Sequence, residues 1–264
     1  MTISIRPKIL LSALVLAVGI AAPSWAEKIK VGVSAGPHAE IFEVVKGIAA
    51  KDGLDIEIVE FTDYVLPNAA LEAGDIQANS FQHQPYLDNQ VKDRGYKIVS
   101  VFPTVVFPMG FYSKKYKTLE QLPEGASVAI PNDPTNGGRA LLLLQSKGFL
   151  KLKDGVGLKP TIIDITENKK KLQIRELDAA QLPRSLGDVD AAAINTNYAI
   201  EAGLDPNKDA IIRETPNSPY TNVIAVRTAD AQQPWVKKLI AAYKSEPVKA
   251  FVQERFKGSV VTSW

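Results

Sequence analysis

The sequence predicts an α/β protein built from two lobes. Short apolar runs alternate with longer amphipathic runs through most of the chain, which indicates βα units and two mainly parallel sheets flanked by helices. One unit also occurs twice: LEAGDIQANSFQHQPYL at 71–87 and RSLGDVDAAAINTNYAI at 184–200 share a helix end, a Gly-Asp pair and a short strand. Two related halves favour two lobes with a ligand between them. The alternative, an ordinary Gly-Asp turn repeated by chance, stays open.

The first 26 residues have the features of an export signal. Two basic residues precede an apolar run over 9–22, and Ser24-Trp25-Ala26 supplies the small residues that a signal peptidase recognises. The run is shorter than the roughly 20 residues that span a bilayer. We therefore expect residues 1–26 to be a cleaved signal peptide, with a mature chain that begins at Glu27 in the periplasm.

Composition narrows the classes of partner and chemistry. The sequence has 31 Lys and Arg and 29 Asp and Glu, and two of the basic residues lie in the signal, so the mature chain is formally neutral. Nucleic acid and anionic membranes are therefore not expected as partners. Cysteine is absent, which excludes disulfides, thiolate metal sites, a cysteine nucleophile and a cysteine-linked lipid anchor. A soluble, unanchored monomer is expected.

The elements follow in order from the apolar periodicity and the turn residues. Strands are predicted at 29–34, 55–61, 76–80, 97–102, 127–130, 161–165, 189–194 and 221–226, and helices at 40–51, 66–73, 119–122 and from 136 onward. In the repeated unit, Gly74 and Gly187 would each end a helix. The next strand delivers Phe81 and His83, or Asn195 and Asn197, at its carboxyl end. That edge is where open α/β sheets bind ligands.

The turn-rich segments GFYSKKYK at 110–117 and TPNSPYTN at 215–222 are where the chain would cross between lobes. Lobe 1 would then contain residues 27–109 and 224–264. Lobe 2 would contain residues 110–223, with hinge crossings near 110–117 and 215–223.

The stretch SVAIPNDPTNGGRALLLLQSKG at 127–148 predicts an anion site. A strand ends at Pro131, and a helix opens at Asn136-Gly137-Gly138-Arg139, where small residues leave backbone N–H groups approachable. Arg139 adds a planar two-pronged donor that suits a carboxylate. The alternative, glycines that only permit tight packing beside a solvated Arg139, stays open. A phosphate loop is not expected, because GxxxxGK[ST] is missing.

Aromatic residues gather at two strand ends of one lobe and predict the wall of an apolar slot. These are Tyr64, Phe81, His83 and Tyr86, with their phenol and imidazole tips directed toward water. His38 and His83 belong to no metal-binding pattern, so neither a metal nor a cofactor is expected. No GxSxG or SxxK is present, and an enzyme is not expected.

A run of specific blocks resembles the methionine-binding proteins of bacterial ABC importers, the NlpA/MetQ type. The blocks are FTDYVLPN, DIQANSFQHQPYLD, DRGYKIV, YSKK, VAIPNDPTNGGRALLLLQ, LKDGVGL, LDAAQLPRSL, INTNYA and SPYTNV, and they extend over essentially the whole mature chain. The resemblance implies a type 2 periplasmic binding protein with two lobes, an interlobe ligand cleft and two hinge crossovers. It further implies capture of L- or D-methionine, or a close analogue, for a membrane permease and its ATPase.

The resemblance also assigns roles to residues. The thioether would lie among Tyr64, Phe81, His83 and Tyr86, the carboxylate would bind Arg139, and Asn195 and Asn222 would fix the head group. Two features depart from the family pattern: many relatives are anchored through a cysteine that this chain lacks, and Gly137-Gly138 replaces a bulkier Leu-Gly. A different small solute, such as another amino acid, a methionine derivative or a sulfonate, remains the alternative.

Overall fold

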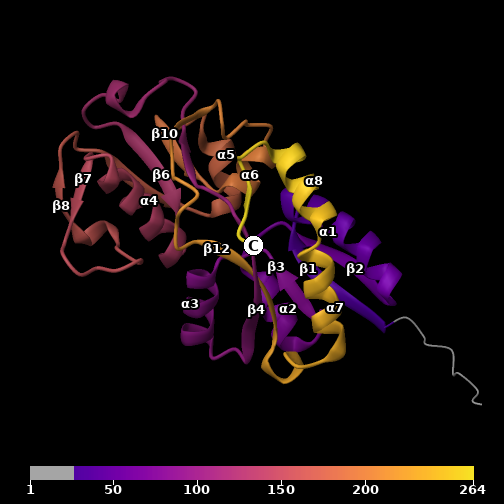
Figure 1. Ribbon diagram of the computed structural model, residues 1–264. Coiled ribbons are helices and arrows are strands. Elements are labelled where there is room, and N and C mark those ends of the chain that lie inside the picture. The colour runs from indigo at the N-terminus through magenta and orange to yellow at the C-terminus, as the bar shows by residue number, and fades with distance from the viewer. Residues whose placement is uncertain (1–26) are drawn as a thin grey trace, which may run out of the picture.

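Two β-sheets organise residues 27–264, the part of the chain that the computed structural model describes (Figure 1). The expected signal peptide, 1–26, lies outside these residues. The larger sheet has the strand order β13 (Val261–Thr262), β4 (Ile98–Val106), β12 (Thr221–Arg227), β3 (Ala78–Ser80), β1 (Glu27–Ser34) and β2 (Leu54–Phe61). The smaller sheet has the order β11 (Ala210–Arg213), β5 (Gly110–Tyr112), β10 (Ala191–Ile194), β6 (Ser127–Pro131) and β9 (Gln173–Leu177). We call the larger sheet with its helices lobe 1 and the smaller sheet with its helices lobe 2.

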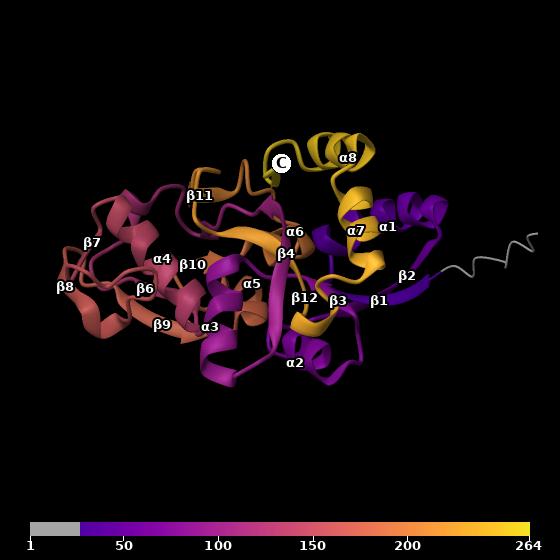
Figure 2. The ribbon, with the colours of Figure 1, turned by 60° about the horizontal axis from the view of Figure 1, so that its bottom comes forward.

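The chain passes between the two sheets twice, and the lobes lie side by side in both views (Figures 1 and 2). It leaves the larger sheet after Val106 and enters the smaller one at Gly110. It returns between Arg213 and Thr221. The first passage therefore precedes the segment 110–117, whose first three residues form β5.

Both sheets are mixed, whereas the sequence predicted mainly parallel ones. β1 is parallel to β2 and β3, as βα units require. β12 is antiparallel to β3 and β4, and β5 is antiparallel to β10 and β11. β5 and β12 each follow a crossing, and the edge strand β13 is also antiparallel to β4. Apolar periodicity identifies a strand but not its direction, so the pattern gave no signal for this reversal.

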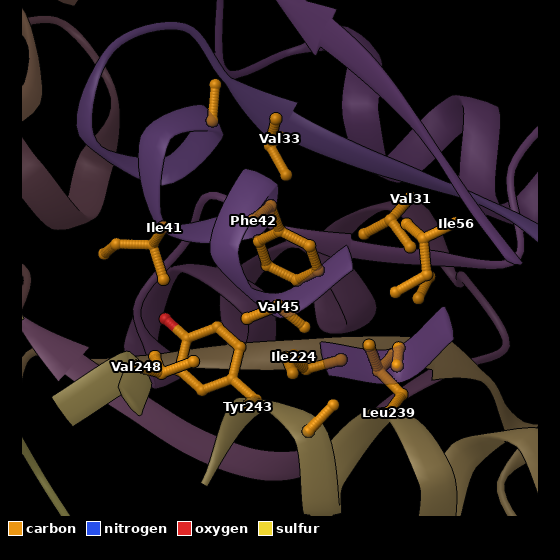
Figure 3. Packing of buried hydrophobic residues seen from close by; sticks show 14 of the residues in the cluster. Val31, Val33, Ile41, Phe42, Val45, Ile56, Ile224, Leu239, Tyr243 and Val248 are labelled. Carbon is orange, nitrogen blue, oxygen red and sulfur yellow. The ribbon is translucent and has the colours of Figure 1, made fainter. Parts of the chain in front are cut away.

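Lobe 1 packs helices on both faces of its sheet. α1 (Pro37–Ala49), α7 (Pro234–Tyr243) and α8 (Glu246–Phe256) cover one face, and α2 (Leu66–Ala73) and α3 (Gln84–Arg94) cover the other (Figure 2). On α1, Ile41, Phe42 and Val45 are buried at helical spacing against the sheet (Figure 3). Burying a side chain such as Phe42 stabilises the fold by about 1.5–3 kcal/mol. This core fixes β1 and β3, whose carboxyl ends reach the site.

Lobe 2 is organised around β10, whose four residues are all buried. Ala191 and Ala193 belong to the apolar cluster with α4 (Pro134–Ser146), while Ala192 and Ile194 pack with α5 (Leu182–Ser185) and α6 (Thr196–Glu201) on the opposite face. Small side chains let both layers approach the strand. β7 (Leu150–Leu152) and β8 (Ile165–Asn168) form a separate hairpin beyond α4.

Two local predictions were wrong. The strand expected at 161–165 is mostly a 3-10 turn, Ile162–Asp164, because the Asp164 carboxylate accepts hydrogen bonds from the Thr161 backbone N–H and hydroxyl. Gly74 does end α2 in the left-handed region, with φ 88°. Gly187, in contrast, is not in that region, and α5 ends before it at Ser185.

Within 27–264, no helix has the length and apolar character needed to cross a bilayer.

Candidate functional site

A cavity lies between the two lobes, at the carboxyl ends of β3 and β10. The space between its lining atoms, with the part open to solvent included, is about 330 Å³. Twelve residues line this interlobe cavity: His38, Tyr64, Phe81, Gln82, His83, Tyr86, Phe107 and Asn222 on the lobe 1 side, and Asn136, Arg139, Asn195 and Asn197 from lobe 2. The structure thus brings together all seven residues that the sequence predicted as ligand-binding.

Three aromatic rings form one wall of the cavity. The ring centroid of Tyr64 lies 6.0 Å from that of Phe81 and 6.2 Å from that of Tyr86, and Phe81 and Tyr86 are 5.9 Å apart. The phenol tips were expected to face water, but both are bonded to protein. The Tyr64 hydroxyl donates to Asn197 Oδ1 at 2.6 Å, and the Tyr86 hydroxyl donates to the Tyr64 carbonyl at 2.8 Å. Burial raises the pKa of both phenols, so they stay neutral.

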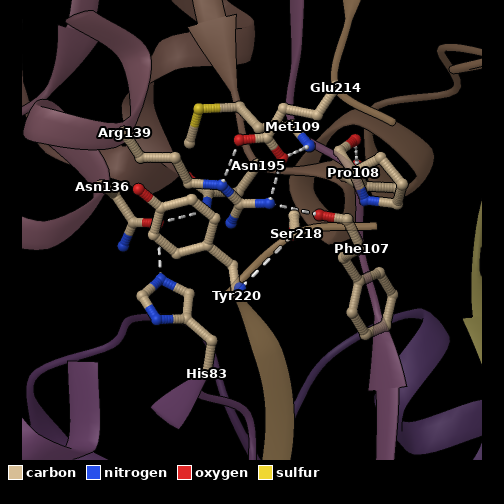
Figure 4. Close-up of polar contacts among 11 residues, drawn as sticks. His83, Phe107, Pro108, Met109, Asn136, Arg139, Asn195, Glu214, Ser218 and Tyr220 are labelled. Atoms are coloured by element: carbon tan, nitrogen blue, oxygen red, sulfur yellow. Dashed lines mark hydrogen bonds and ion pairs between the residues drawn. The ribbon is translucent and has the colours of Figure 1, made fainter. Parts of the chain in front are cut away.

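His83 joins the wall to a polar network across the lobes. Its Nδ1 accepts the Tyr86 backbone N–H at the start of α3, so the proton is on Nε2, which donates to Asn136 Oδ1 at 3.1 Å (Figure 4). Asn136 Oδ1 also accepts from Asn195 Nδ2 at 2.9 Å. Burial, with a further contribution from the Arg139 charge, lowers the pKa of His83 to about 3. The imidazole is therefore an uncharged hydrogen-bond donor and not, as expected, a ring with its tip in water.

Arg139 is buried and paired within the protein. Its Nε and Nη2 donate to the two carboxylate oxygens of Glu214 at 2.8 and 2.5 Å, and Nη2 also donates to the Phe107 carbonyl at 2.8 Å (Figure 4). The guanidinium stacks on Tyr220, 4.3 Å from the ring centroid. The two-pronged side that was expected to hold a ligand carboxylate is thus taken by Glu214. Nη1 donates to no atom of residues 27–264.

The start of α4 also differs from the expected anion site. The Asp133 carboxylate accepts the backbone N–H groups of Thr135 and Asn136, so these amides are not available to an anion. A Cβ at Gly137 would lie 2.7 Å from the Pro131 carbonyl oxygen. The first of the two glycines therefore permits tight packing, and the bulkier residue of the family pattern would not fit this backbone without a shift.

Three residues that line the cavity, two on lobe 2 and one on lobe 1, each have a buried polar atom without a partner among residues 27–264. Asn195 Oδ1 has no hydrogen-bond donor, and Asn197 Nδ2 has no acceptor, among the described residues. His38 Nδ1 is a third such atom, because Nε2 donates to Asn222 Oδ1 at 3.3 Å. Burial lowers the pKa of His38 to about 4, which leaves Nδ1 an acceptor. Each unsatisfied group costs about 1–3 kcal/mol. A zwitterionic head group could satisfy all of these atoms. Its ammonium would donate to the acceptors Asn195 Oδ1 and His38 Nδ1, and its carboxylate would accept from Asn197 Nδ2 and Arg139 Nη1.

Several lining residues were not predicted from the sequence. His38, Gln82, Phe107 and Asn136 were not assigned to the ligand, and Asn197 was placed at a strand end without a role. His38 follows the end of β1, and a strand-end rule alone could have indicated it. No short motif marks Glu214, whose contact with Arg139 spans 75 positions.

No group of three or more His, Cys, Asp or Glu side chains in residues 27–264 could hold a metal ion. Although both histidines line the cavity, each is already bonded to an asparagine amide oxygen. The cavity is therefore built from uncharged polar groups, aromatic rings and one neutralised arginine.

Side-chain hydrogen bonds join the two lobes, and they describe a closed arrangement. Inside the cavity, Tyr64 is bonded to Asn197 and His83 to Asn136. Outside it, Tyr198 donates to the Thr62 carbonyl at 3.2 Å, and Lys159 Nζ donates to Asn89 Oδ1 at 2.7 Å. Asn207 Nδ2 donates to the Lys257 carbonyl at 3.3 Å.

Known proteins resemble this chain over its described length. D-methionine-binding lipoprotein MetQ of Salmonella typhimurium is 54% identical over 239 residues, which cover 89% of this chain and 88% of that protein. A solved nutrient-binding protein of Burkholderia cenocepacia bound to methionine is 60% identical, with a TM-score of 0.88 and coverage of 89% of this chain and 100% of that one. A periplasmic substrate-binding protein of an ABC transporter from Coxiella burnetii is 50% identical, with a TM-score of 0.86 and the same coverage.

These likenesses confirm the two-lobed fold of a periplasmic binding protein that the sequence predicted. The family model described as NlpA lipoprotein matches residues 29–264. The chain therefore belongs to the NlpA lipoprotein family.

Proposed function

We propose that this protein is the periplasmic solute-binding component of an ABC importer and that it captures methionine, in the L or D form, between its lobes. The observation that carries the proposal is the division of the cavity into two halves. One half is a wall of aromatic rings, and the other holds Arg139 Nη1 with the unpartnered atoms of Asn195 and Asn197. The 60% identity to a protein solved with methionine supports the same ligand.

Methionine suits this division chemically. Its carboxylate would accept from Arg139 Nη1 and Asn197 Nδ2, and its ammonium would donate to Asn195 Oδ1, with Asn222 completing the head-group site. Its thioether would lie against Tyr64, Phe81, His83 and Tyr86, where each sulfur–aromatic contact contributes about 0.3–1.5 kcal/mol. The unsatisfied polar atoms of Asn195 and Asn197 would then gain partners.

Capture requires no bond to break, so we propose a binding protein and not an enzyme, with no cofactor or metal. Opening would separate the interlobe hydrogen bonds, and closure over methionine would create the surface that the permease and ATPase assembly recognises. We propose that the moving units follow the two sheets, with boundaries within a few residues of 109/110 and 223/224. The protein would act as a monomer and would not bind nucleic acid.

We further propose a periplasmic protein without a lipid anchor. The relatives are named lipoproteins, whereas the 264 residues contain no cysteine that could be acylated. Osmotic shock should release the protein with an N-terminus at Glu27. Recovery in the membrane fraction with an acylated N-terminus would contradict this part of the proposal.

The experiment that tests the ligand is mass spectrometry of small molecules released when freshly purified protein is denatured. Methionine should be the main species, and titration calorimetry of the refolded protein should then rank the L and D forms. Asn195→Ala should weaken binding, while Asn132→Ala, at an exposed position outside the cavity, should not. If the protein releases another amino acid or a sulfonate and does not bind methionine, then that solute, and not methionine, is the ligand.

A further inference from the structure

Glu214 is tied to the anchor arginine and to both crossings between the lobes. Its carboxylate accepts from Arg139 Nε and Nη2, and Oε2 also accepts the Met109 backbone N–H at 2.9 Å. Its own N–H donates to the Met109 carbonyl at 3.0 Å. Met109 lies on the first crossing and Glu214 on the second (Figure 4). The side chains of Arg139 and Glu214 are only 2% and 11% exposed, so this pair is shielded from solvent.

The pair makes the interlobe cavity nearly neutral. The Arg139 cation and the Glu214 anion cancel, and the lowered pKa values of His38 and His83, at about 4 and 3, leave both rings uncharged. The raised pKa values of the wall phenols leave those neutral as well. Two carboxylates lie near the aromatic wall. Asp133 accepts four hydrogen bonds at the start of α4 and faces the positive end of that helix. Asp63 accepts the backbone N–H groups of Val65 and Leu66 at the start of α2.

A neutral cavity selects the charge of its ligand. An uncompensated charge is very unfavourable in a site closed off from water, whereas a zwitterion brings a cation and an anion together. An anion with the same side chain would meet Arg139 already neutralised, with only Nη1 left to donate.

We propose that Glu214 is a specificity-determining positioning residue: it neutralises Arg139 and holds the guanidinium so that the cavity accepts ligands of zero net charge and rejects anions. This inference rests on the proposed function, because it takes methionine as the ligand of the cavity. Beyond that function, the inference names Glu214 as the residue that requires a ligand carboxylate to be accompanied by an ammonium group.

The test compares two ligands that differ only in charge: L-methionine and its 2-hydroxy acid analogue, in which a hydroxyl replaces the ammonium. Both keep the thioether and the carboxylate, so loss of a carboxylate contact affects them equally. The measured quantity is the ratio of the Kd of the hydroxy acid to the Kd of methionine, obtained by titration calorimetry. Wild-type protein should favour methionine.

Glu214→Gln gives the cavity a net positive charge while it keeps the size of the side chain. The ratio should fall at least tenfold in favour of the hydroxy acid. Arg139→Gln leaves Glu214 unpaired and should move the ratio at least tenfold the other way. The double variant with both substitutions is neutral again, and its ratio should return to within about threefold of wild type even though both ligands bind more weakly.

Glu40→Gln is the matched control. Glu40 on α1 also accepts two hydrogen bonds from an arginine, Arg255 on α8, at 2.6 and 3.1 Å, but it does not line the cavity. The ratio of the two Kd values in Glu40→Gln should equal that of wild type. Circular dichroism melting identifies any variant that does not fold, and if Glu214→Gln fails, the Arg139→Gln and double variants still decide the question.

Equal losses for both ligands in Glu214→Gln, or a double variant that does not restore the ratio, would overturn the proposal and leave Glu214 a structural residue. Wild-type protein that binds the hydroxy acid as tightly as methionine would also overturn it. Failure of the proposed function looks different, because wild-type protein would then not bind methionine at all.

Discussion

Replacing Tyr64 by phenylalanine should weaken methionine binding without unfolding the protein. The Tyr64 hydroxyl donates to Asn197 Oδ1 across the lobes at 2.6 Å, which leaves Asn197 Nδ2 as the atom that we expect to face the ligand. Tyr64→Phe would leave Oδ1 buried without a donor in the closed state only, since opening would expose it to water. The cost of about 1–3 kcal/mol would therefore appear as lost affinity, roughly fivefold to a hundredfold.

Titration calorimetry with L-methionine measures this loss, and thermal melting without ligand checks the fold. Tyr96→Phe is the control, because the Tyr96 hydroxyl makes no side-chain hydrogen bond within 27–264 and lies outside the cavity. The raised pKa of the Tyr64 phenol keeps it a neutral donor, so the loss should be the same at pH 6 and pH 8. Wild-type affinity in Tyr64→Phe would refute both the interlobe role of the bond and the orientation of Asn197.

Three further predictions concern packing and pH. Phe81→Ala should weaken methionine by about 1–3 kcal/mol in calorimetry, and unchanged affinity would place Phe81 in the core instead. Gly137→Leu should lower the free energy of unfolding by about 1–3 kcal/mol, because its Cβ would meet the Pro131 carbonyl; Gly187→Ala, with open space around it, should not. Because the folded-state pKa of His38, about 4, lies below the unfolded value, the contribution of His38 to stability should be full above about pH 6.5 and fall by roughly 3 kcal/mol toward pH 4. His83, whose pKa is also lowered, adds a loss of the same sign that is present with and without His38. Urea titrations of wild type and His38→Gln should differ in this slope, and identical slopes would contradict it.

The sequence predicted the elements that carry their own local signal. The bounds of α2 match the prediction at both ends. Gly74 ends the helix in the left-handed region, and Pro67 lies in its first turn. Both copies of the Gly-Asp unit lead into strands, β3 and β10, that end at the cavity from opposite lobes. α3 was missed because its sequence QPYLDNQVKDR is largely polar, and its start depends on the His83 side chain as a cap.

Seven of the twelve residues that line the cavity were predicted as ligand-binding, but their chemistry was only partly predictable. Asp133 before Pro134 is a helix-cap signal that the sequence does contain, yet the following glycines were interpreted as an anion site. The partner of Arg139 lies 75 positions away on the second crossing, and no periodicity or spacing links the two. Pairing between distant charges depends on how the lobes fold together. The partner of the Arg139 guanidinium could therefore be identified only from the structure.

The most direct test of the account is a crystal structure of the mature protein with bound methionine. We expect the carboxylate within hydrogen-bond distance of Arg139 Nη1, the ammonium at Asn195 Oδ1, and the thioether against the rings of Tyr64, Phe81 and Tyr86, with the Arg139–Glu214 pair intact. Methionine bound in the reverse orientation, bound outside the interlobe cavity, or bound with Glu214 turned away from Arg139 would contradict the account.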